Sequence, residues 1–136
     1  MDKLSMGLGI KSTFSLAASF MTAMLGGWDM MLVILIMFVV IDYITGVLAA
    51  AVQGKLSSRA GFKGIVQKVM IFALVAVAHL LDLILSGNHN FIRDTVIFFY
   101  LFNELISIIE NAGEVGLPIP GILMRAIEIL RNKSSE

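Results

Sequence analysis

The side chains that could do chemistry in this sequence are acids placed inside long apolar runs. Asp42 is the one charged residue between Met30 and Gly54, and Asp82 and Glu104 interrupt two later apolar runs. A carboxylate at the centre of a bilayer costs about 3 kcal/mol, whereas each large aliphatic residue contributes about 0.3–0.6 kcal/mol toward insertion. The run around Asp42 therefore still inserts as a helix, and its acid requires a polar partner.

These acids do not form a recognisable catalytic or metal site. His79 and Asp82 are three residues apart, but two residues complete neither a metal ligand set nor a catalytic group. The chain has no cysteine and a formal net charge of zero, so it offers no thiolate chemistry and no basic surplus for nucleic acid. We predict no enzyme activity, no cofactor or metal, and no nucleic-acid partner.

Small and polar residues mark where helices are expected to meet. Gly46 and Ala50 form a small-xxx-small pattern that permits close approach of another helix. Asn103, Ser107 and Glu110 share one face of a later helix. The polar or assembly candidates within the membrane are Asp42, Gly46, Ala50, Asp82, Asn103, Glu104, Ser107 and Glu110. Two interpretations remain open: these groups bond one another inside one bundle, or they bond between subunits or line an aqueous path.

The composition requires lipid as the solvent. Hydrophobic residues make up 58% of the chain, charged residues make up 15%, and the mean hydropathy is +0.92. A soluble domain of 136 residues could not hide that much apolar side chain. We therefore predict a single all-α, polytopic membrane domain over residues 1–136.

The apolar runs predict the helices of this domain. The three strong spans are expected at Met30–Val52, Val66–Leu85 and Thr95–Ile109. The first run is long enough to cross about 30 Å of hydrocarbon at about 1.5 Å per residue. Asn103 and Glu104 leave the third span near break-even, so other helices must hold it. Residues 111–121, with Pro118 and Pro120, predict a rigid break before an amphipathic, cytoplasmic helix at 121–132.

A shorter helix is predicted at Ser12–Leu25, as a weak first span or as a helix lying in the membrane interface. Its hydroxyl groups recur at helical spacing, at Ser12, Ser15, Ser19 and Thr22. This stripe could face a pore, another helix or lipid headgroups. A signal peptide is disfavoured because no small-x-small cleavage site precedes Trp28.

Basic residues predict the orientation. The cytoplasmic loop at 54–64 and the helix entry after it carry Lys55, Arg59, Lys63 and Lys68, which we expect to contact anionic lipid headgroups. With four crossings, nine of the ten Lys and Arg residues are cytoplasmic and Arg93 alone is outside; with three crossings, seven are inside. Both topologies place the C-terminus in the cytoplasm, and the four-crossing count fits better.

Several short runs carry a resemblance to a known family. They are Asp42-Tyr43-Ile44-Thr45-Gly46, Gly54-Lys55-Leu56-Ser57-Ser58, and Ser107-Ile108-Ile109-Glu110-Asn111 before Gly116-Leu117-Pro118-Ile119-Pro120. The chain resembles the phage-lysis and toxin-secretion holins over roughly residues 15 to 130, although Gln67-Lys68 stands where two lysines are expected. The resemblance implies a non-catalytic protein of the bacterial cytoplasmic membrane. Such a protein oligomerises with itself into pores or lesions that release an endolysin or a toxin.

Two other classes of function remain open. A small ion channel or proton-coupled carrier would use Asp42, Asp82 and Glu104 as a relay across the membrane. A non-conducting membrane adaptor would use the basic loop and the C-terminal helix as a docking surface. Neither class accounts for the holin-like runs.

Overall fold

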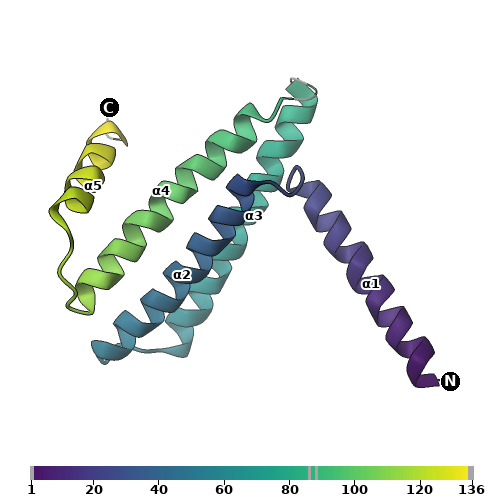
Figure 1. Ribbon diagram of the computed structural model, residues 1–136, viewed down its shortest axis with the longest axis horizontal. Coiled ribbons are helices and arrows are strands. Elements are labelled where there is room, and N and C mark those ends of the chain that lie inside the picture. The colour runs from purple at the N-terminus through teal and green to yellow at the C-terminus, as the bar shows by residue number, and fades with distance from the viewer. Residues whose placement is uncertain (1, 86, 88, 135–136) are drawn as a thin grey trace.

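The computed structural model describes residues 2–85, 87 and 89–134, and all of its regular elements are α-helices (Figure 1). The helices are α1 (Asp2–Met24), α2 (Met30–Val52), α3 (Ser58–Leu85), α4 (Phe91–Glu114) and α5 (Gly121–Ser134). The predicted all-α class is confirmed. The C-terminal helix covers the predicted range 121–132 and extends two residues further.

Helices α2, α3 and α4 form the packed part of the molecule. In Figure 1, α2 and α4 run in the same direction and α3 runs against both. Helix α4 packs extensively against α2 and also against α3, whereas α2 and α3 touch each other little. The apolar core lies between the three helices and consists of Leu35, Val39, Ile71, Val75 and Ile97. The fold thus depends on α4 to join the other two helices.

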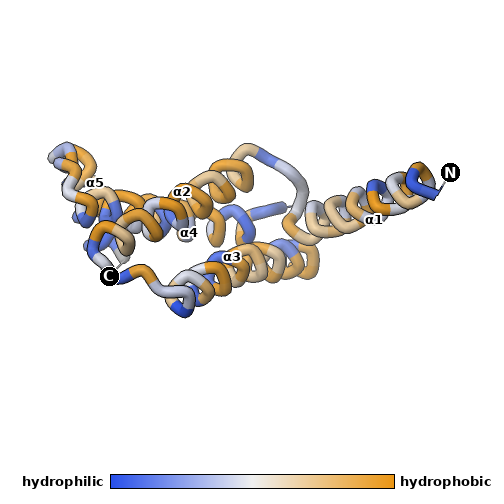
Figure 2. Tube along the Cα trace, turned by 90° about the horizontal axis from the view of Figure 1, so that it is seen from below, coloured by the Kyte–Doolittle hydropathy of each residue, from blue (hydrophilic) through white to orange (hydrophobic). Residues whose placement is uncertain are grey.

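The outer faces of α2 and α3 are apolar and open. Met37, Ile44 and Leu48 on α2 are each more than half exposed, and Figure 2 shows hydrophobic residues along most of α2 and α3. Among the described residues, these two helices are the ones long and apolar enough to cross a membrane. An apolar face without a protein partner is the arrangement expected of a helix in lipid.

The prediction of three strong spans is therefore wrong, because α2 and α3 meet that description and α4 does not. Helix α4, which contains the third predicted span, is long enough, but it carries five charged residues, namely Arg93, Asp94, Glu104, Glu110 and Glu114. Its polarity makes α4 dependent on the polar groups that α2 and α3 present to it. The helix that contains the second predicted span, Val66–Leu85, begins before it at Ser58, where the hydroxyl of Ser57 accepts a hydrogen bond from the Ala60 N–H (3.1 Å).

Helix α1 begins at Asp2 instead of Ser12 and buries none of its residues. It projects away from the other helices in Figure 1 and contacts α3 near the C-terminal end of α1. The Ser12 hydroxyl donates to the Leu8 carbonyl of the same helix (2.8 Å), and Thr22 does the same to Ala18 (2.7 Å). Ser15 and Ser19 are exposed. The hydroxyl stripe therefore faces outward in the single chain.

Candidate functional site

One lysine joins two acids between the three packed helices. Lys68 of α3 donates to Asp42 Oδ2 of α2, and to Glu104 of α4 at 2.6 Å (Oε2) and 2.9 Å (Oε1). The side chains of Asp42 and Glu104 are only 7% and 6% exposed, and that of Lys68 is 20% exposed. We call these three residues the central ion cluster. It supplies the partner that the apolar run around Asp42 requires, and it leaves two carboxylates sharing one ammonium.

Two glycines of α3 lie against Tyr43 beside this cluster. A Cβ atom on Gly64 would lie 3.4 Å from the ring of Tyr43, and one on Gly61 would lie 3.5 Å from its hydroxyl. The Tyr43 hydroxyl donates to the Gly61 carbonyl (3.4 Å). The ring of Tyr43 thus packs against the glycine backbone of α3, one helical turn before Lys68.

An amide ties α4 to α2 beside the cluster. Asn111 Nδ2 donates to Asp42 Oδ1 (3.0 Å), to the Asp42 carbonyl (3.2 Å) and to Thr45 Oγ1 (3.0 Å). A Cβ on Gly46 would lie 3.5 Å from this nitrogen. Gly46 of α2 therefore faces Asn111 of α4, and an added methyl group there would meet the amide at van der Waals distance.

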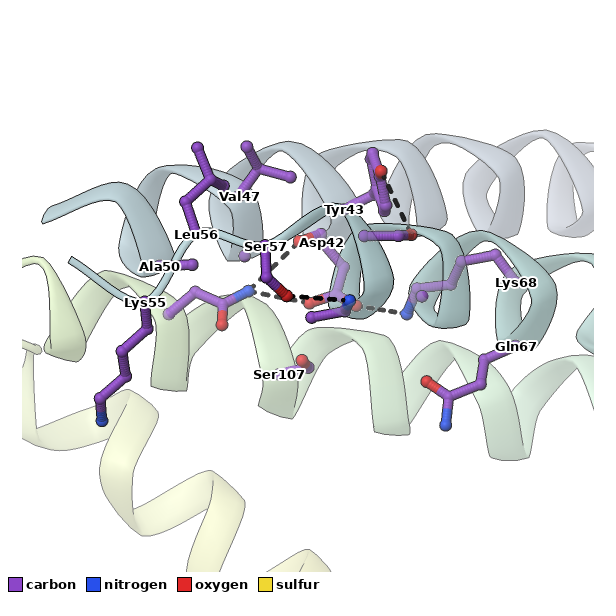
Figure 3. Close-up of a pocket in the computed structure, with 15 residues that line it drawn as sticks. Asp42, Tyr43, Val47, Ala50, Lys55, Leu56, Ser57, Gln67, Lys68 and Ser107 are labelled. Carbon is purple, nitrogen blue, oxygen red and sulfur yellow. Dashed lines mark hydrogen bonds and ion pairs between the residues drawn. The ribbon is translucent and has the colours of Figure 1, made fainter. Parts of the chain in front are cut away.

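A cavity of about 280 Å³ lies beside the cluster (Figure 3). Its polar lining consists of Asp42, Lys55, Ser57, Gln67, Lys68, Ser107 and Asn111, and most of the remaining lining is glycine and alanine, including Ala50. The cavity extends from the 53–57 loop to Asp42, and the small residues leave the space that larger side chains would fill. A water-sized or headgroup-sized polar ligand could reach the cluster by this route.

Arg93 forms a second polar centre, which joins the α1–α2 connection to the start of α4. Its side chain is fully buried, and Nη1 donates to Asp29 Oδ2 (2.7 Å) and to Asp94 Oδ1 (3.0 Å). Its Nε donates to the Leu25 carbonyl (2.6 Å). We call Arg93, Asp29 and Asp94 the outer clamp. The hydrogen bond from Arg93 holds the pKa of Asp29 below its ordinary value.

The clamp also explains the turn that precedes it. Gly26 has a φ of 84°, a left-handed conformation that favours glycine. A Cβ at this position would lie 2.7 Å from both Arg93 Nε and His79 Nδ1. The sequence therefore needs glycine here for two separate reasons.

Asp82 acts as a cap and does not join the central ion cluster. Its carboxylate accepts hydrogen bonds from the backbone N–H groups of Ile92 (2.9 Å) and Arg93 (2.8 Å), which begin α4. These N–H groups have no partner inside their own helix, and a carboxylate at a helix start is favoured by the helix dipole. The three acids in apolar runs therefore occupy two separate places, with Asp42 and Glu104 together and Asp82 near the outer clamp.

Comparison with known proteins agrees with the holin-like runs. A family described as the bacteriophage holin family matches residues 19–132. The chain belongs to the bacteriophage holin family. It is 52% identical to an uncharacterized protein of Listeria monocytogenes, over 82% of this chain and 79% of that protein. It is 35% identical to a protein of Bacillus phage phi105 named a probable holin, over 79% of this chain and 76% of that protein. No solved structure matches the chain significantly.

Membership of the holin family indicates a non-enzymatic membrane protein. Among the described residues, no group of three or more His, Cys, Asp or Glu side chains could hold a metal ion. The two polar centres described above consist of ion pairs and hydrogen bonds between helices.

The other predicted residues of this holin-family chain lie at its surface. Asn103 is exposed, and Glu110 pairs with Arg131 of α5 where both side chains are more than half exposed. Lys55, Arg59 and Lys63 are exposed near the 53–57 loop. Sequence reasoning placed Lys68 with these basic residues and did not select Asp29 or Arg93 as site residues. Arg93 had one signal, because it is the cation on the side opposite to the other nine in the four-crossing topology.

Proposed function

We propose that this chain is a holin that assembles with itself in the bacterial cytoplasmic membrane and opens lesions that release an endolysin or a toxin. The observation that carries the proposal is the holin-family match over residues 19–132, supported by the phage relative named a probable holin. The extensive apolar surface of a single chain supports the same proposal, because it suits a protein surrounded by lipid and by copies of itself.

The central ion cluster suggests how such a protein accumulates before lesions form. Helix α4 is the most polar of the three packed helices. Lys68 pairs with its acid Glu104, and its own Asn111 donates a hydrogen bond to Asp42 of α2, all within one chain. In the proposed holin, these bonds keep each chain folded in the membrane. Lesions then depend on contacts between many copies, so they arise steeply with concentration after a delay.

The proposed topology has the 53–57 loop and the C-terminal helix in the cytoplasm and the outer clamp on the opposite side. It follows from the nine-to-one division of basic residues in the four-crossing arrangement. A cysteine at Ser5 distinguishes the two span counts with an impermeant thiol reagent in intact cells. It is shielded if four segments cross, and it is labelled if α1 lies flat on the outer surface and three cross.

The function is tested by inducing the protein in bacteria and following two signals together. We expect growth to stop after a delay, with release of a cytoplasmic reporter enzyme into the medium. A co-expressed endolysin without an export signal should lyse the culture, whereas cells with the endolysin alone should stay intact. Potassium loss from the first minutes, in proportion to expression and without enzyme release, would instead support the ion-channel alternative. A stable protein partner without any leakage would support the adaptor alternative.

A further inference from the structure

An apolar groove of about 390 Å³ lies between α3 and α4, in the half of these helices nearest the outer clamp. Its lining includes Leu74, Val77 and Leu81 of α3 and Thr95, Val96 and Phe99 of α4. Val77 and Phe99 are each more than half exposed. The described chain therefore leaves this groove open to lipid or to another helix.

Polar side chains continue the line of the groove along α4. Asn103, Glu110 and Glu114 follow Val96 at intervals of seven, seven and four residues, so they share one face of the helix, and all three are exposed. We call them the polar stripe. Glu110 pairs with Arg131, whereas the side chains of Asn103 and Glu114 form no hydrogen bond or ion pair with the described residues. An amide that faces hydrocarbon near the middle of a membrane helix requires a partner from another helix.

Helix α1 carries groups that complement both the groove and the polar stripe. It buries none of its residues and projects from the body of the molecule (Figure 1). Its half nearest the outer clamp is uncharged and exposes Phe14 and Phe20. Its other half carries Lys3 and Lys11 against a single acid, Asp2, and both lysines are exposed. Helix α1 is thus apolar at the level of the groove and cationic toward the end at which α4 carries Glu110 and Glu114.

The outer clamp sets α1 and α4 at a common level. Arg93, near the start of α4, donates to the carbonyl of Leu25, which follows the last residue of α1 (2.6 Å). In the four-crossing topology both helices run from this level toward the cytoplasm. Ser15 precedes Leu25 by ten residues and Asn103 follows Arg93 by ten. At 1.5 Å per residue, Ser15 and Asn103 therefore both lie about 15 Å from the clamp.

The charged residues match in level by the same count. Lys3 lies about 33 Å from the clamp along α1, and Glu114 lies about 32 Å from it along α4. Lys11 lies about 21 Å along α1, and its long side chain can extend toward Glu110, about 26 Å along α4. One polar pair and two charge pairs are thus in register.

The chain's own α1 lies away from the groove. Gly26, in the connection after α1, lies against His79, since a Cβ on this glycine would be 2.7 Å from His79 Nδ1. By helical spacing, His79 is on the opposite side of α3 from Leu74 and Leu81, which line the groove. The segment that can cover the groove is therefore α1 of a second copy.

We propose that α1 of one copy lies along the groove and the polar stripe of the next copy, with Ser15 beside Asn103 and Lys3 beside Glu114. This interface rests on the self-assembly and the four-crossing topology of the proposed function. Each copy gives one α1 and receives another, so the contact is head-to-tail. Such contacts either close into rings or continue as open arrays.

Disulfide crosslinking tests the register of this interface, because the chain has no cysteine of its own. Two differently tagged full-length copies, one with Ser15→Cys and one with Asn103→Cys, are oxidised in membranes before any reporter enzyme is released. We expect a mixed dimer. Val40→Cys replaces Asn103→Cys as the matched control, because Val40 is 50% exposed at about 17 Å from the clamp but lines the groove between α2 and α3. We expect no dimer above background with the control.

A single chain that carries both Ser15→Cys and Asn103→Cys separates the possible arrangements. A head-to-tail interface gives a ladder of dimers, trimers and larger products. A disulfide within one chain, without mixed dimers, would place α1 on its own α4 and overturn the proposal. Equal dimer from Ser15→Cys alone would indicate pairing of α1 with α1, and equal dimer with Val40→Cys would indicate contact without this register; either result would also overturn it.

The charge pairs are tested in the same assay. Glu114→Lys places a cation opposite Lys3 and should lower the yield of mixed dimer about threefold, and Lys3→Glu in the partner copy should restore it. Glu128→Lys, which makes the same charge change at an exposed site on α5, should leave the yield unchanged. Delayed release of the reporter enzyme without the mixed dimer would refute this interface and leave the holin function standing. A ladder without release would support the interface and contradict the holin function.

Discussion

Replacing Lys68 by methionine tests whether the central ion cluster holds α4 in place. The substitution keeps an unbranched, flexible side chain of similar reach and removes the ammonium that bridges Asp42 and Glu104. Both acids are less than a tenth exposed, so neither can turn to water without moving a helix. We expect a large loss in the free energy of unfolding.

The size of that loss follows from two limits. Removing one partner of a buried ion pair costs about 3–5 kcal/mol. An acid left without its partner can take up a proton instead, and for an ordinary carboxyl group at pH 7 this costs roughly 4 kcal/mol. The cheaper response sets the effect, so Lys68→Met should lower the free energy of unfolding by about 3–4 kcal/mol.

The measurement is unfolding in mixed micelles with increasing sodium dodecyl sulfate at pH 7. Gln67→Met is the matched control, because Gln67 is the adjacent exposed residue, and its effect should stay within about 0.5 kcal/mol. Adding Glu104→Gln to Lys68→Met should recover part of the loss, since the amide removes one of the two unpaired charges. Equal losses for Lys68→Met and Gln67→Met would refute the assignment of the cluster as the link between the helices.

Three further predictions concern other parts of the chain. The pKa of Asp29 is lowered from its ordinary value of 3.8, so the stability that the outer clamp contributes is complete above that pH and is lost as the pH falls through the lower folded pKa. Fluorescence of Trp28 should therefore shift on acidification below pH 3.8, and Asp29→Asn should show the shift already at pH 7; an acid-insensitive signal would contradict this. Gly46→Leu should destabilise the chain by about 1–3 kcal/mol through crowding of the amide that links α4 to α2, with Gly46→Ala much milder; equal melting of the two variants would argue against that contact. In intact cells before lesions open, a cysteine at Asn90 should react with an impermeant thiol reagent and one at Leu56 should not, and the reverse pattern would invert the proposed topology.

Properties that depend on local composition were predictable from the sequence. The all-α class, the Met30–Val52 helix with both of its ends, and the break after α4 follow from apolar run length and from the positions of glycine and proline. The holin-like runs identified the family for the same reason, since short motifs are read directly from the order of residues. The sequence also showed that Asp42 needed a partner, because the energy of a charge in lipid depends little on the rest of the fold.

The choice of partners was decided by the tertiary structure alone. Lys68 lies 26 residues from Asp42 and 36 from Glu104, and Arg93 lies 64 residues from Asp29. Whether such residues meet depends on which helices are neighbours and on how each is rotated about its axis. Those two quantities are set by many weak packing contacts, including the glycines that face Tyr43, and none of them is a property of one segment. For the same reason, the sequence showed that the third span needs other helices to hold it, but only the structure shows that Lys68 and Asp82 of α3 do so.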